Sequence, residues 1–178
     1  MEFIDVYNKN WEKTGRIIDR YDSSVTLTDE EYILVVGCWV FNSKKQILLT
    51  KRSPEKKFAP NLWENTGGHA MAGETGPEAI VRELAEETGI QAAQEEMVEL
   101  GRAVKQGGLA LEYVVFKDVP AEEIKLQPGE TCEARWVSEE EFDHMIETGE
   151  VAPSVAESLA PFREAFDQAL HRGSSLNK

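Results

Sequence analysis

Between Gly68 and Ile90, four glutamates and an arginine are spaced so that they can act together. They are Glu74, Arg82, Glu83, Glu86 and Glu87. Residues three and four positions apart share one face of a helix, so Glu83, Glu86 and Glu87 project together. Carboxylates this close repel one another unless a cation lies among them, and such hard oxygens suit Mg²⁺ or Mn²⁺ better than zinc or copper. The segment therefore predicts a divalent metal site suited to phosphate chemistry.

The same segment carries the signals of a glycine loop that runs into a short helix. Thr75 and Glu78 have the spacing of a capping box, and Pro77 suits the first helical turn. Gly89 suits the position just past the helix end. We therefore predict a helix over residues 76–88.

Two features of the segment would support a metal site. Arg82 can hold a carboxylate through two parallel hydrogen bonds, with Glu74 as its partner. Gly67 and Gly68 allow close backbone approach and could offer a carbonyl to the metal. The alternative is a solvated acidic helix face, but such a face would gain from lysines opposite Glu83 and Glu87, where the chain has like charges.

Composition limits the partners of the chain. Its 178 residues contain 33 Asp and Glu against 19 Lys and Arg, a formal charge of −14. This sign argues against binding a nucleic-acid duplex or an anionic membrane. A small diphosphate compound stays possible, because metal ions and a few local bases can bridge the charges.

The cysteines and the N-terminus indicate a protein of the reducing cytoplasm. Cys38 lies in an apolar run and is expected in the core, while Cys132 is expected to be a free thiol; neither has a CxxC partner for zinc. The opening residues lack the regions of a signal peptide. The longest nearly apolar run, residues 32–41, is too short to cross a bilayer.

Periodicity and turn residues predict a mixed α+β fold with one central helix and further helices at the C-terminal end. The expected strands are 2–7 and 15–20, forming a hairpin with Gly15 at the turn, then 31–41, 46–51, a short strand within 60–67, 96–104, 109–118 and 134–137. Further helices are expected at 139–147, where Ser138 and Glu141 repeat the capping-box spacing, and at 153–171.

We expect a single domain over residues 1–172, with residues 1–28 as an N-terminal hairpin extension and 173–178 as a disordered tail. The last helix has apolar residues at helical spacing, which suit either packing on its own domain or a homodimer interface: Val155, Leu159, Phe162, Phe166 and Leu170.

Residues 68–90 match the Nudix box, the pattern G-x5-E-x7-R-E-U-x-E-E-x-G-U with U aliphatic. All nine fixed positions are filled in order, by Gly68, Glu74, Arg82, Glu83, Leu84, Glu86, Glu87, Gly89 and Ile90. The chain thus resembles a Nudix hydrolase over roughly residues 30–150.

The resemblance implies an α/β/α sandwich with a mixed sheet, and Mg²⁺- or Mn²⁺-dependent cleavage of a diphosphate linked to another group. It makes Glu83, Glu86 and Glu87 the metal ligands, with a carbonyl of Gly67 or Gly68 completing the site. Alternatively, one of these glutamates, with Glu83 preferred, serves instead as the base toward the attacking water. A further glutamate from outside the box helps in many relatives, and Glu130 and Glu133 are the candidates, although either can equally be an ordinary surface charge.

Residues 51–74 and 5–20 are also similar to type 1 isopentenyl-diphosphate isomerase, a Nudix-fold enzyme that is not a hydrolase. Those isomerases have an essential cysteine just before the Gly-His pair. This chain has Gly67 there, ahead of Gly68 and His69, and neither Cys38 nor Cys132 is placed to substitute. We therefore do not expect isomerase activity.

A basic cluster and one histidine complete the candidate site. Lys51 and Arg52 are expected to bind substrate phosphate, because the similar isomerase segment uses basic residues there. Lys56 also belongs to the candidate site, although it and Lys57 could as well be charges of a solvated turn. His69 beside the glycine pair could contact substrate, or serve only as a structural hydrogen-bonding residue.

The leading hypothesis is a Mg²⁺-dependent hydrolase of a small diphosphate compound. The alternatives are an isomerase of the prenyl-diphosphate branch, which Gly67 argues against, and a module that senses a nucleotide without turnover. An intact set of box glutamates argues against the sensor. Substrate choice is not encoded in the box.

Overall fold

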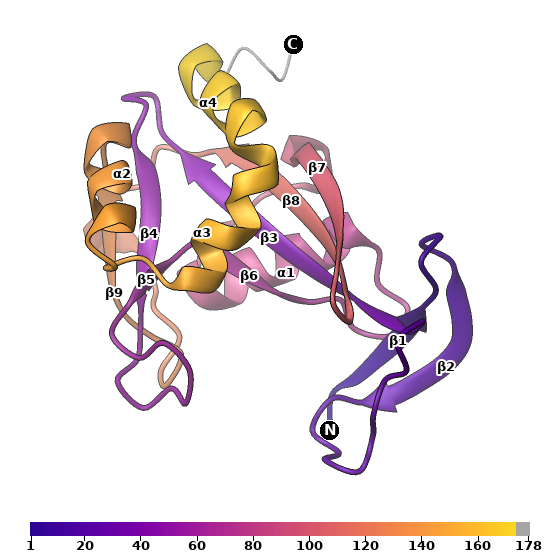
Figure 1. Cartoon of the computed structure of the whole chain (residues 1–178). Helices are drawn as coiled ribbons and strands as arrows, with labels where there is room; N and C mark the ends of the chain where they lie inside the picture. The colour runs from indigo at the N-terminus through magenta and orange to yellow at the C-terminus, as the bar shows by residue number, and fades with distance from the viewer. Residues whose placement is uncertain (174–178) are drawn as a thin grey trace.

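The computed structural model describes residues 1–173, so all of the predicted tail except Gly173 lies outside the described part. A mixed sheet lies between helices (Figure 1). Its strands are β1 (Phe3–Tyr7), β2 (Lys13–Asp19), β3 (Tyr32–Phe41), β4 (Ile47–Arg52), β5 (Trp63–Glu64), β6 (Thr66–His69), β7 (Val98–Lys105), β8 (Gly108–Phe116) and β9 (Thr131–Val137). The α-helices are α1 (Gly76–Thr88), α2 (Glu139–Glu147), α3 (Pro153–Leu159) and α4 (Arg163–Arg172), and the 3-10 turns are η1 (Gln94–Glu96), η2 (Ala121–Glu123) and η3 (Ala160–Phe162).

Strand β3 is the centre of the sheet. It pairs in parallel with β8 along its length, from Ile33 opposite Gly108 to Phe41 opposite Phe116. On its other side it pairs antiparallel with β1 and β6. Since β3 is buried almost throughout, its sequence is a nearly continuous apolar run, as expected for a central strand.

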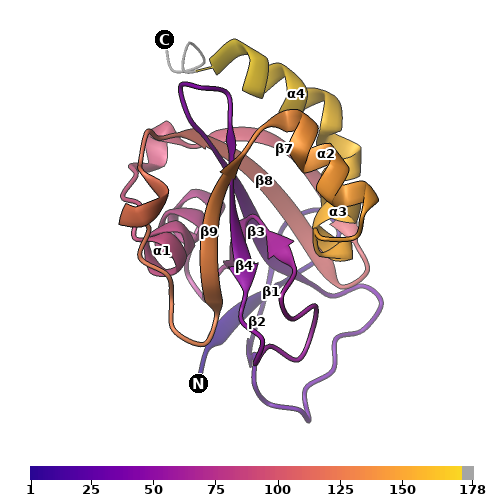
Figure 2. The same cartoon turned by 90° about the vertical axis from the view of Figure 1, so that its left-hand side faces the viewer.

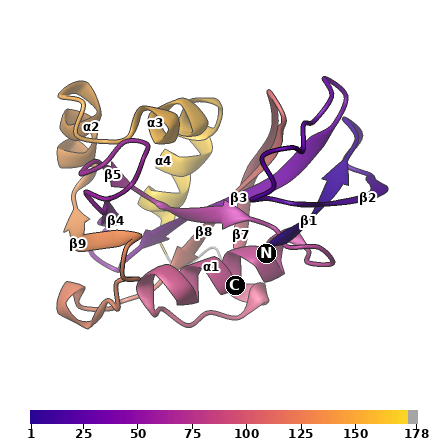
Figure 3. The same ribbon diagram turned by 90° about the horizontal axis from the view of Figure 1, so that it is seen from below.

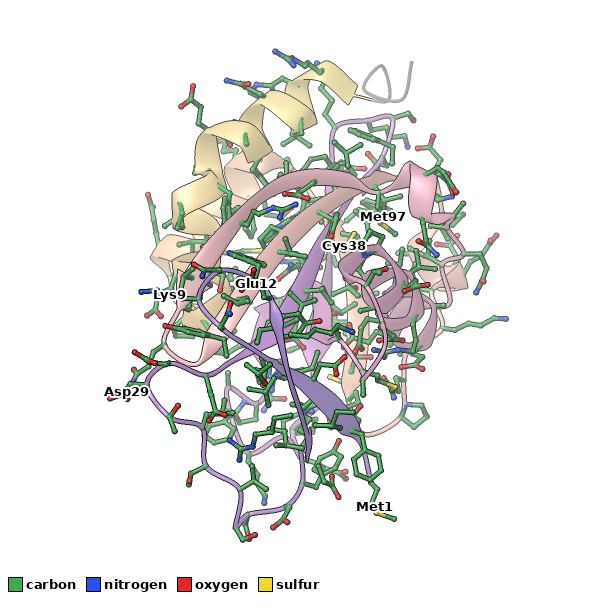
Figure 4. All side chains as sticks on the ribbon, turned by 90° about the vertical axis from the view of Figure 1, so that its right-hand side faces the viewer. Met1, Lys9, Glu12, Asp29, Cys38 and Met97 are labelled. Atoms are coloured by element: carbon green, nitrogen blue, oxygen red, sulfur yellow. The ribbon has the colours of Figure 1, made fainter. Side chains whose placement is uncertain are left out.

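Helices cover both faces of this sheet, which confirms the predicted sandwich. Helix α1 lies against one face, and α2, α3 and α4 lie against the other (Figures 2 and 3). The α1 side buries Ile80, Leu84 and Cys38, and Cys38 lies inside the fold as predicted (Figure 4). The opposite side is an aromatic core in which Trp39 and Phe166 meet edge to face, with ring centroids 4.9 Å apart.

Helix α1 begins and ends where its sequence signals place it. The Thr75 side chain accepts a hydrogen bond from the Glu78 backbone N–H, and the Glu78 carboxylate accepts one from the Thr75 N–H. At the other end Gly89 has φ +73°, a left-handed conformation that glycine adopts at little cost. Local chemistry thus fixes both ends of the helix that carries the box glutamates.

The N-terminal hairpin forms, but the predicted turn at Gly15 is wrong. Gly15 lies inside β2 with φ +86°, at the point where the pairing slips between Asp5 and Tyr7. The chain reverses earlier, over residues 8–12, where the Asn8 side chain accepts backbone hydrogen bonds from Asn10 and Glu12. Gly15 therefore allows the irregular pairing within β2 and does not form the turn.

The single helix predicted over residues 153–171 is also wrong. It is divided into α3, η3 and α4, with Pro161 in the short 3-10 turn between them. Proline has no backbone N–H for a helical hydrogen bond and its ring crowds the preceding turn. The five predicted apolar residues nevertheless all lie in the interior.

None of the helices within residues 1–173 combines the length and the apolar character that crossing a membrane requires.

Candidate active site

A cavity of about 620 Å³ opens where α1, β6 and the N-terminal hairpin meet. Its walls come from the hairpin (Glu2, Arg20, Tyr21), β3 (35–37), the β5–β6 segment (64–69), α1 (Arg82, Glu83, Glu86, Glu87), β8 (Glu112), the loop before β9 (Gln127, Glu130), residues Arg52 and Lys56, and α3 (Ser154, Val155, Ser158). Segments far apart in the chain thus converge on the glutamates of α1.

Arg82 organises these glutamates. Its Nε and Nη2 donate to the two carboxylate oxygens of Glu74 at 2.8 and 2.9 Å, which confirms the predicted bidentate pair. Its Nη1 donates to Glu83 at 2.9 Å and to Glu86 at 3.3 Å, and its Nη2 also donates to the His69 carbonyl at 3.0 Å. The Arg82 guanidinium lowers the pKa of Glu74. Arg82 therefore joins the loop before α1 to the face of α1.

Glu83 lies directly against the glycine pair. A Cβ placed on Gly68 would collide with the Glu83 carboxylate, so this close approach needs a glycine at that position. The Glu83 side chain is 13% exposed. Burial raises its pKa, although Arg82 opposes the change.

Glu87 has no such cationic partner. It accepts a hydrogen bond from the Gly67 backbone N–H at 3.3 Å. Burial, followed by repulsion from Glu64 and Glu83, raises the pKa of Glu87 to about 8. Its raised pKa thus reflects first its burial and then the neighbouring carboxylates, with no cation beside it among the described residues to offset either.

The donor set suits a hard divalent cation. Within residues 1–173, no three His, Cys, Asp or Glu side chains stand close enough together to hold a metal ion in the observed arrangement. Arg82 contacts two of the three box glutamates, Glu83 and Glu86, and so occupies oxygens that a cation would share. Burial and neighbouring carboxylates raise the pKa of Glu87, and the Glu83 carboxylate lies against Gly68, so several carboxylates are gathered in this pocket.

The charge on Glu87 should cost stability at high pH. The pKa of Glu87 in the fold, about 8, lies above the ordinary value of 4.5. The free energy of unfolding is therefore highest below about pH 4.5, where this group is protonated in both states, and it falls as the pH rises through 8. In EDTA, Glu87→Gln should melt about 3–6 °C above the wild type at pH 8 and close to it at pH 5. Thermal unfolding at the two pH values measures the difference. An equal difference at both values would contradict the assigned titration.

The other predicted site residues divide into two groups. Arg52 and Lys56 line the cavity, where Arg52 pairs with Glu64 at 2.6 Å and Lys56 pairs with Glu130. Lys51 and Glu133 do not line it: they form an ion pair with each other at 3.6 Å. Of the two candidate glutamates outside the box, the cavity therefore includes Glu130 and leaves out Glu133.

His69 lines the cavity beside the glycine pair. Burial and the nearby charge of Arg20 lower its pKa to about 4, so the ring is neutral at pH 7. Its Nδ1 has no hydrogen-bond partner among the described residues. His69 can therefore offer a substrate a neutral ring nitrogen but not a positive charge.

Several residues that line the cavity were not predicted. Glu64 is the largest electrostatic contributor to the raised pKa of Glu87. Glu112 reaches the cavity from the middle of β8, and Arg20 with Tyr21 reaches it from the hairpin. The one sequence signal for Glu112 was Gly37, because a glycine within an apolar strand often marks the close approach of another group.

Residues 31–159 match the NUDIX domain family. The match covers well over half of the chain and includes the glutamates of α1 and the cavity residues of β8 and the β9 loop. The chain belongs to this family.

Individual relatives agree with this assignment. A Listeria monocytogenes protein named an uncharacterized Nudix hydrolase is 34% identical over 160 residues, which are 86% of this chain and 89% of the relative. An isopentenyl-diphosphate Delta-isomerase of Saccharopolyspora erythraea is 38% identical over 91 residues, 51% of this chain and 45% of the isomerase. The crystal structure of DR0079 from Deinococcus radiodurans has the same fold, with a TM-score of 0.74 and 24% identity over 90% of this chain and 99% of that one.

Proposed function

We propose that the protein is a Mg²⁺-dependent hydrolase that cleaves the diphosphate bond of a nucleoside diphosphate-linked or related small molecule. The charge of the cavity is the observation that carries this proposal. Seven glutamates line it, against four Arg and Lys side chains: Glu2, Glu64, Glu83, Glu86, Glu87, Glu112 and Glu130 face Arg20, Arg52, Lys56 and Arg82. A diphosphate would enter an excess of negative charge unless divalent cations enter with it.

The box glutamates take the central roles. Glu83, Glu86 and Glu87, with a carbonyl of Gly67 or Gly68, would hold Mg²⁺ or Mn²⁺. When bound, the cation neutralises the diphosphate and lowers the pKa of water. Glu83 would accept the proton of the attacking water, because its low exposure and raised pKa suit a general base.

The surrounding residues would position the reacting groups. Arg82, tied to Glu74 and the His69 carbonyl, keeps Glu83 and Glu86 oriented. Arg52 and Lys56 hold Glu64 and Glu130 at the cavity wall and bring positive charge to the substrate phosphates. Lys51 keeps its partner Glu133 and would contribute less than Arg52.

The surroundings of Gly67 support hydrolysis over isomerisation. A Cβ at this position would lie 2.7 Å from the Val36 carbonyl oxygen, so a cysteine there would force β6 away from β3. Cys38 is fully buried, and burial raises the pKa of its thiol well above the usual range. Cys132 is exposed and is not among the cavity residues. Neither cysteine can supply the missing thiol.

A turnover assay separates the hydrolase from the nucleotide sensor. The wild type should release phosphate or pyrophosphate products from at least one member of a panel of dNTPs, oxidised nucleotides, nucleotide sugars, dinucleoside polyphosphates, CoA and prenyl diphosphates, and EDTA should stop the reaction. Glu86→Gln should lower that rate by about a hundredfold while the protein stays folded. Binding of panel members without metal-dependent turnover would favour the sensor and contradict the hydrolase.

A further inference from the structure

A buried acid of the N-terminal hairpin faces the loop that precedes α1. Successive side chains of a strand alternate between its two faces, so Asp5 shares a face of β1 with Tyr7, and Ile4 and Val6 lie on the other face. Tyr7 packs in the core on the α1 side, while Ile4 and Val6 pack in a small core of their own with Ile18. Asp5 is only 8% exposed. A charge buried to this extent costs free energy unless it is paired and hydrogen-bonded.

Two donors meet one oxygen of Asp5. Its Oδ2 accepts a hydrogen bond from the backbone N–H of Gly73 at 2.8 Å and forms an ion pair with Lys13 Nζ at 2.7 Å. Burial raises the pKa of Asp5, but the Gly73 hydrogen bond and Lys13 together bring it below its ordinary value. Asp5 is therefore a carboxylate at neutral pH, and its charge strengthens the hydrogen bond from Gly73.

The backbone of β1 holds the same loop beside Asp5. The Phe3 carbonyl accepts a hydrogen bond from the Ala72 N–H at 2.8 Å, so the hairpin binds two consecutive amides of the loop. Gly73 has φ +92°, a left-handed conformation that glycine adopts at little cost. The hairpin thus fixes the loop at its point of tightest curvature.

This loop ends at the glutamate that binds Arg82. The Glu74 N–H donates to the Met71 carbonyl at 3.0 Å, and the Glu74 carboxylate accepts a hydrogen bond from the Met71 N–H at 2.8 Å. The same carboxylate binds Arg82, which in turn donates to Glu83. A series of hydrogen bonds, continued through the short loop itself, therefore connects Asp5 to the carboxylates of α1.

We propose that Asp5 is a positioning residue, which holds the loop before α1 so that Arg82 keeps the carboxylates of α1 in the arrangement that binds a divalent cation. This inference rests on the proposed function, since that function assigns the cation to the α1 end of the cavity. Groups that orient metal ligands from behind strongly affect metal affinity and activity. The family match begins at residue 31, so the positioning of the metal ligands extends here to a segment outside the shared domain.

The test compares Mn²⁺ binding by the intact variants, measured from the electron paramagnetic resonance of free Mn²⁺, with turnover of the panel member that the wild type cleaves best. Asp5→Ala leaves the Gly73 N–H without its acceptor. It should weaken Mn²⁺ binding about tenfold and lower kcat about tenfold, with KM changed less than about twofold. Asp5→Asn keeps an oxygen that can accept this hydrogen bond, so its Mn²⁺ affinity should stay within about threefold of the wild type.

Two variants are matched controls. Lys13→Met removes the ion pair and leaves the Gly73 hydrogen bond, so its Mn²⁺ affinity should stay within about twofold of the wild type. Asp118→Ala removes another carboxylate that accepts a backbone N–H, that of Ser43 at 2.8 Å, and neither of these residues lines the cavity. It should change neither Mn²⁺ binding nor kcat.

Amide hydrogen exchange of the wild type supplies a test that needs no variant. A loop that favours the cation-binding arrangement must in turn be stabilised by the bound cation, because such coupling is reciprocal. Saturating Mg²⁺ should therefore slow exchange of the Ala72 and Gly73 amides about tenfold. The Trp11 amide, which donates to the Asn8 carbonyl in the hairpin turn, should exchange at the same rate with and without Mg²⁺.

The failure of this inference differs from the failure of the proposed function. If Asp5→Ala binds Mn²⁺ as tightly as Asp118→Ala does, Asp5 has no positioning role. If Asp5→Ala does not fold, unchanged exchange of Ala72 and Gly73 in Mg²⁺ overturns that role. A wild type that binds Mn²⁺ but cleaves no panel member would contradict the proposed function, while weaker binding by Asp5→Ala would still support the positioning role. A wild type that binds no Mn²⁺ would contradict both.

Discussion

Replacing Glu87 with glutamine should lower metal-dependent turnover by about a thousandfold, the loss of roughly 4 kcal/mol of transition-state stabilisation. Glu87 is the box carboxylate with no arginine partner, and its pKa is raised to about 8 by burial and by Glu64 and Glu83. A bound cation would gain most from the negative charge of this carboxylate. The neutral amide of glutamine cannot supply that charge. Steady-state kinetics across Mg²⁺ concentrations measures the loss.

The stability of the same variant separates a catalytic role from a folding defect. Glu87→Gln should be inactive yet more stable than the wild type in EDTA at pH 8, because the amide needs no counter-charge. Glu95→Gln, an exposed glutamate in the 3-10 turn η1, should keep both wild-type activity and wild-type stability. If Glu87→Gln turned over at the wild-type rate, Glu87 would have no role in catalysis.

Replacing Arg82 with methionine should have the largest effect on folding. Arg82 donates to Glu74, Glu83 and the His69 carbonyl, and its side chain is 19% exposed. Its loss leaves two partly buried carboxylates without a counter-ion, which should lower the free energy of unfolding by about 2–4 kcal/mol. For a chain of this size the melting temperature should fall by about 5–15 °C.

Arg102→Met is the matched control for this loss. Arg102 also holds a glutamate, Glu99, at 2.7 Å, but its side chain is 57% exposed and that of Glu99 is 36% exposed. Water screens such a pair, so the control should change the free energy of unfolding by less than about 0.5 kcal/mol. Equal losses of unfolding free energy in the two variants would mean that the Arg82 contacts stabilise the fold no more than an exposed ion pair does. Addition of Mg²⁺ should not rescue Arg82→Met, because the Glu74 contact is then still missing.

The sequence predicted the parts of the site that local chemistry determines. The capping box at Thr75 and the glycine past Thr88 fix α1, and helical spacing alone places Glu83 and Glu87 on one side of it. The Arg82–Glu74 pair lies eight residues apart within the same segment. Such short-range features depend little on the rest of the fold, and they were confirmed.

Errors and omissions arose where distant segments decide the outcome. Glu112 meets Gly37 only because β3 and β8 pair in parallel, 75 residues apart in the chain. Arg20 reaches the cavity through the course of the hairpin, which the misplaced turn at Gly15 obscured. Pro161 differs from these, because a proline is a local signal that a helix is interrupted. The regular spacing of apolar residues on both sides of Pro161 nevertheless predicted one continuous helix.

The most direct test of a metal-dependent site is the position of Mn²⁺ in crystals of the wild type, found from its anomalous scattering. We expect a Mn²⁺ peak within coordination distance of carboxylate oxygens of Glu83 and Glu87 and of a carbonyl of Gly67 or Gly68, with Arg82 still bound to Glu74. Glu87→Gln crystals should lose the peak or show it much weaker. A Mn²⁺ ion bound elsewhere in the cavity, or none at millimolar concentration, would contradict a metal site formed by the glutamates of α1.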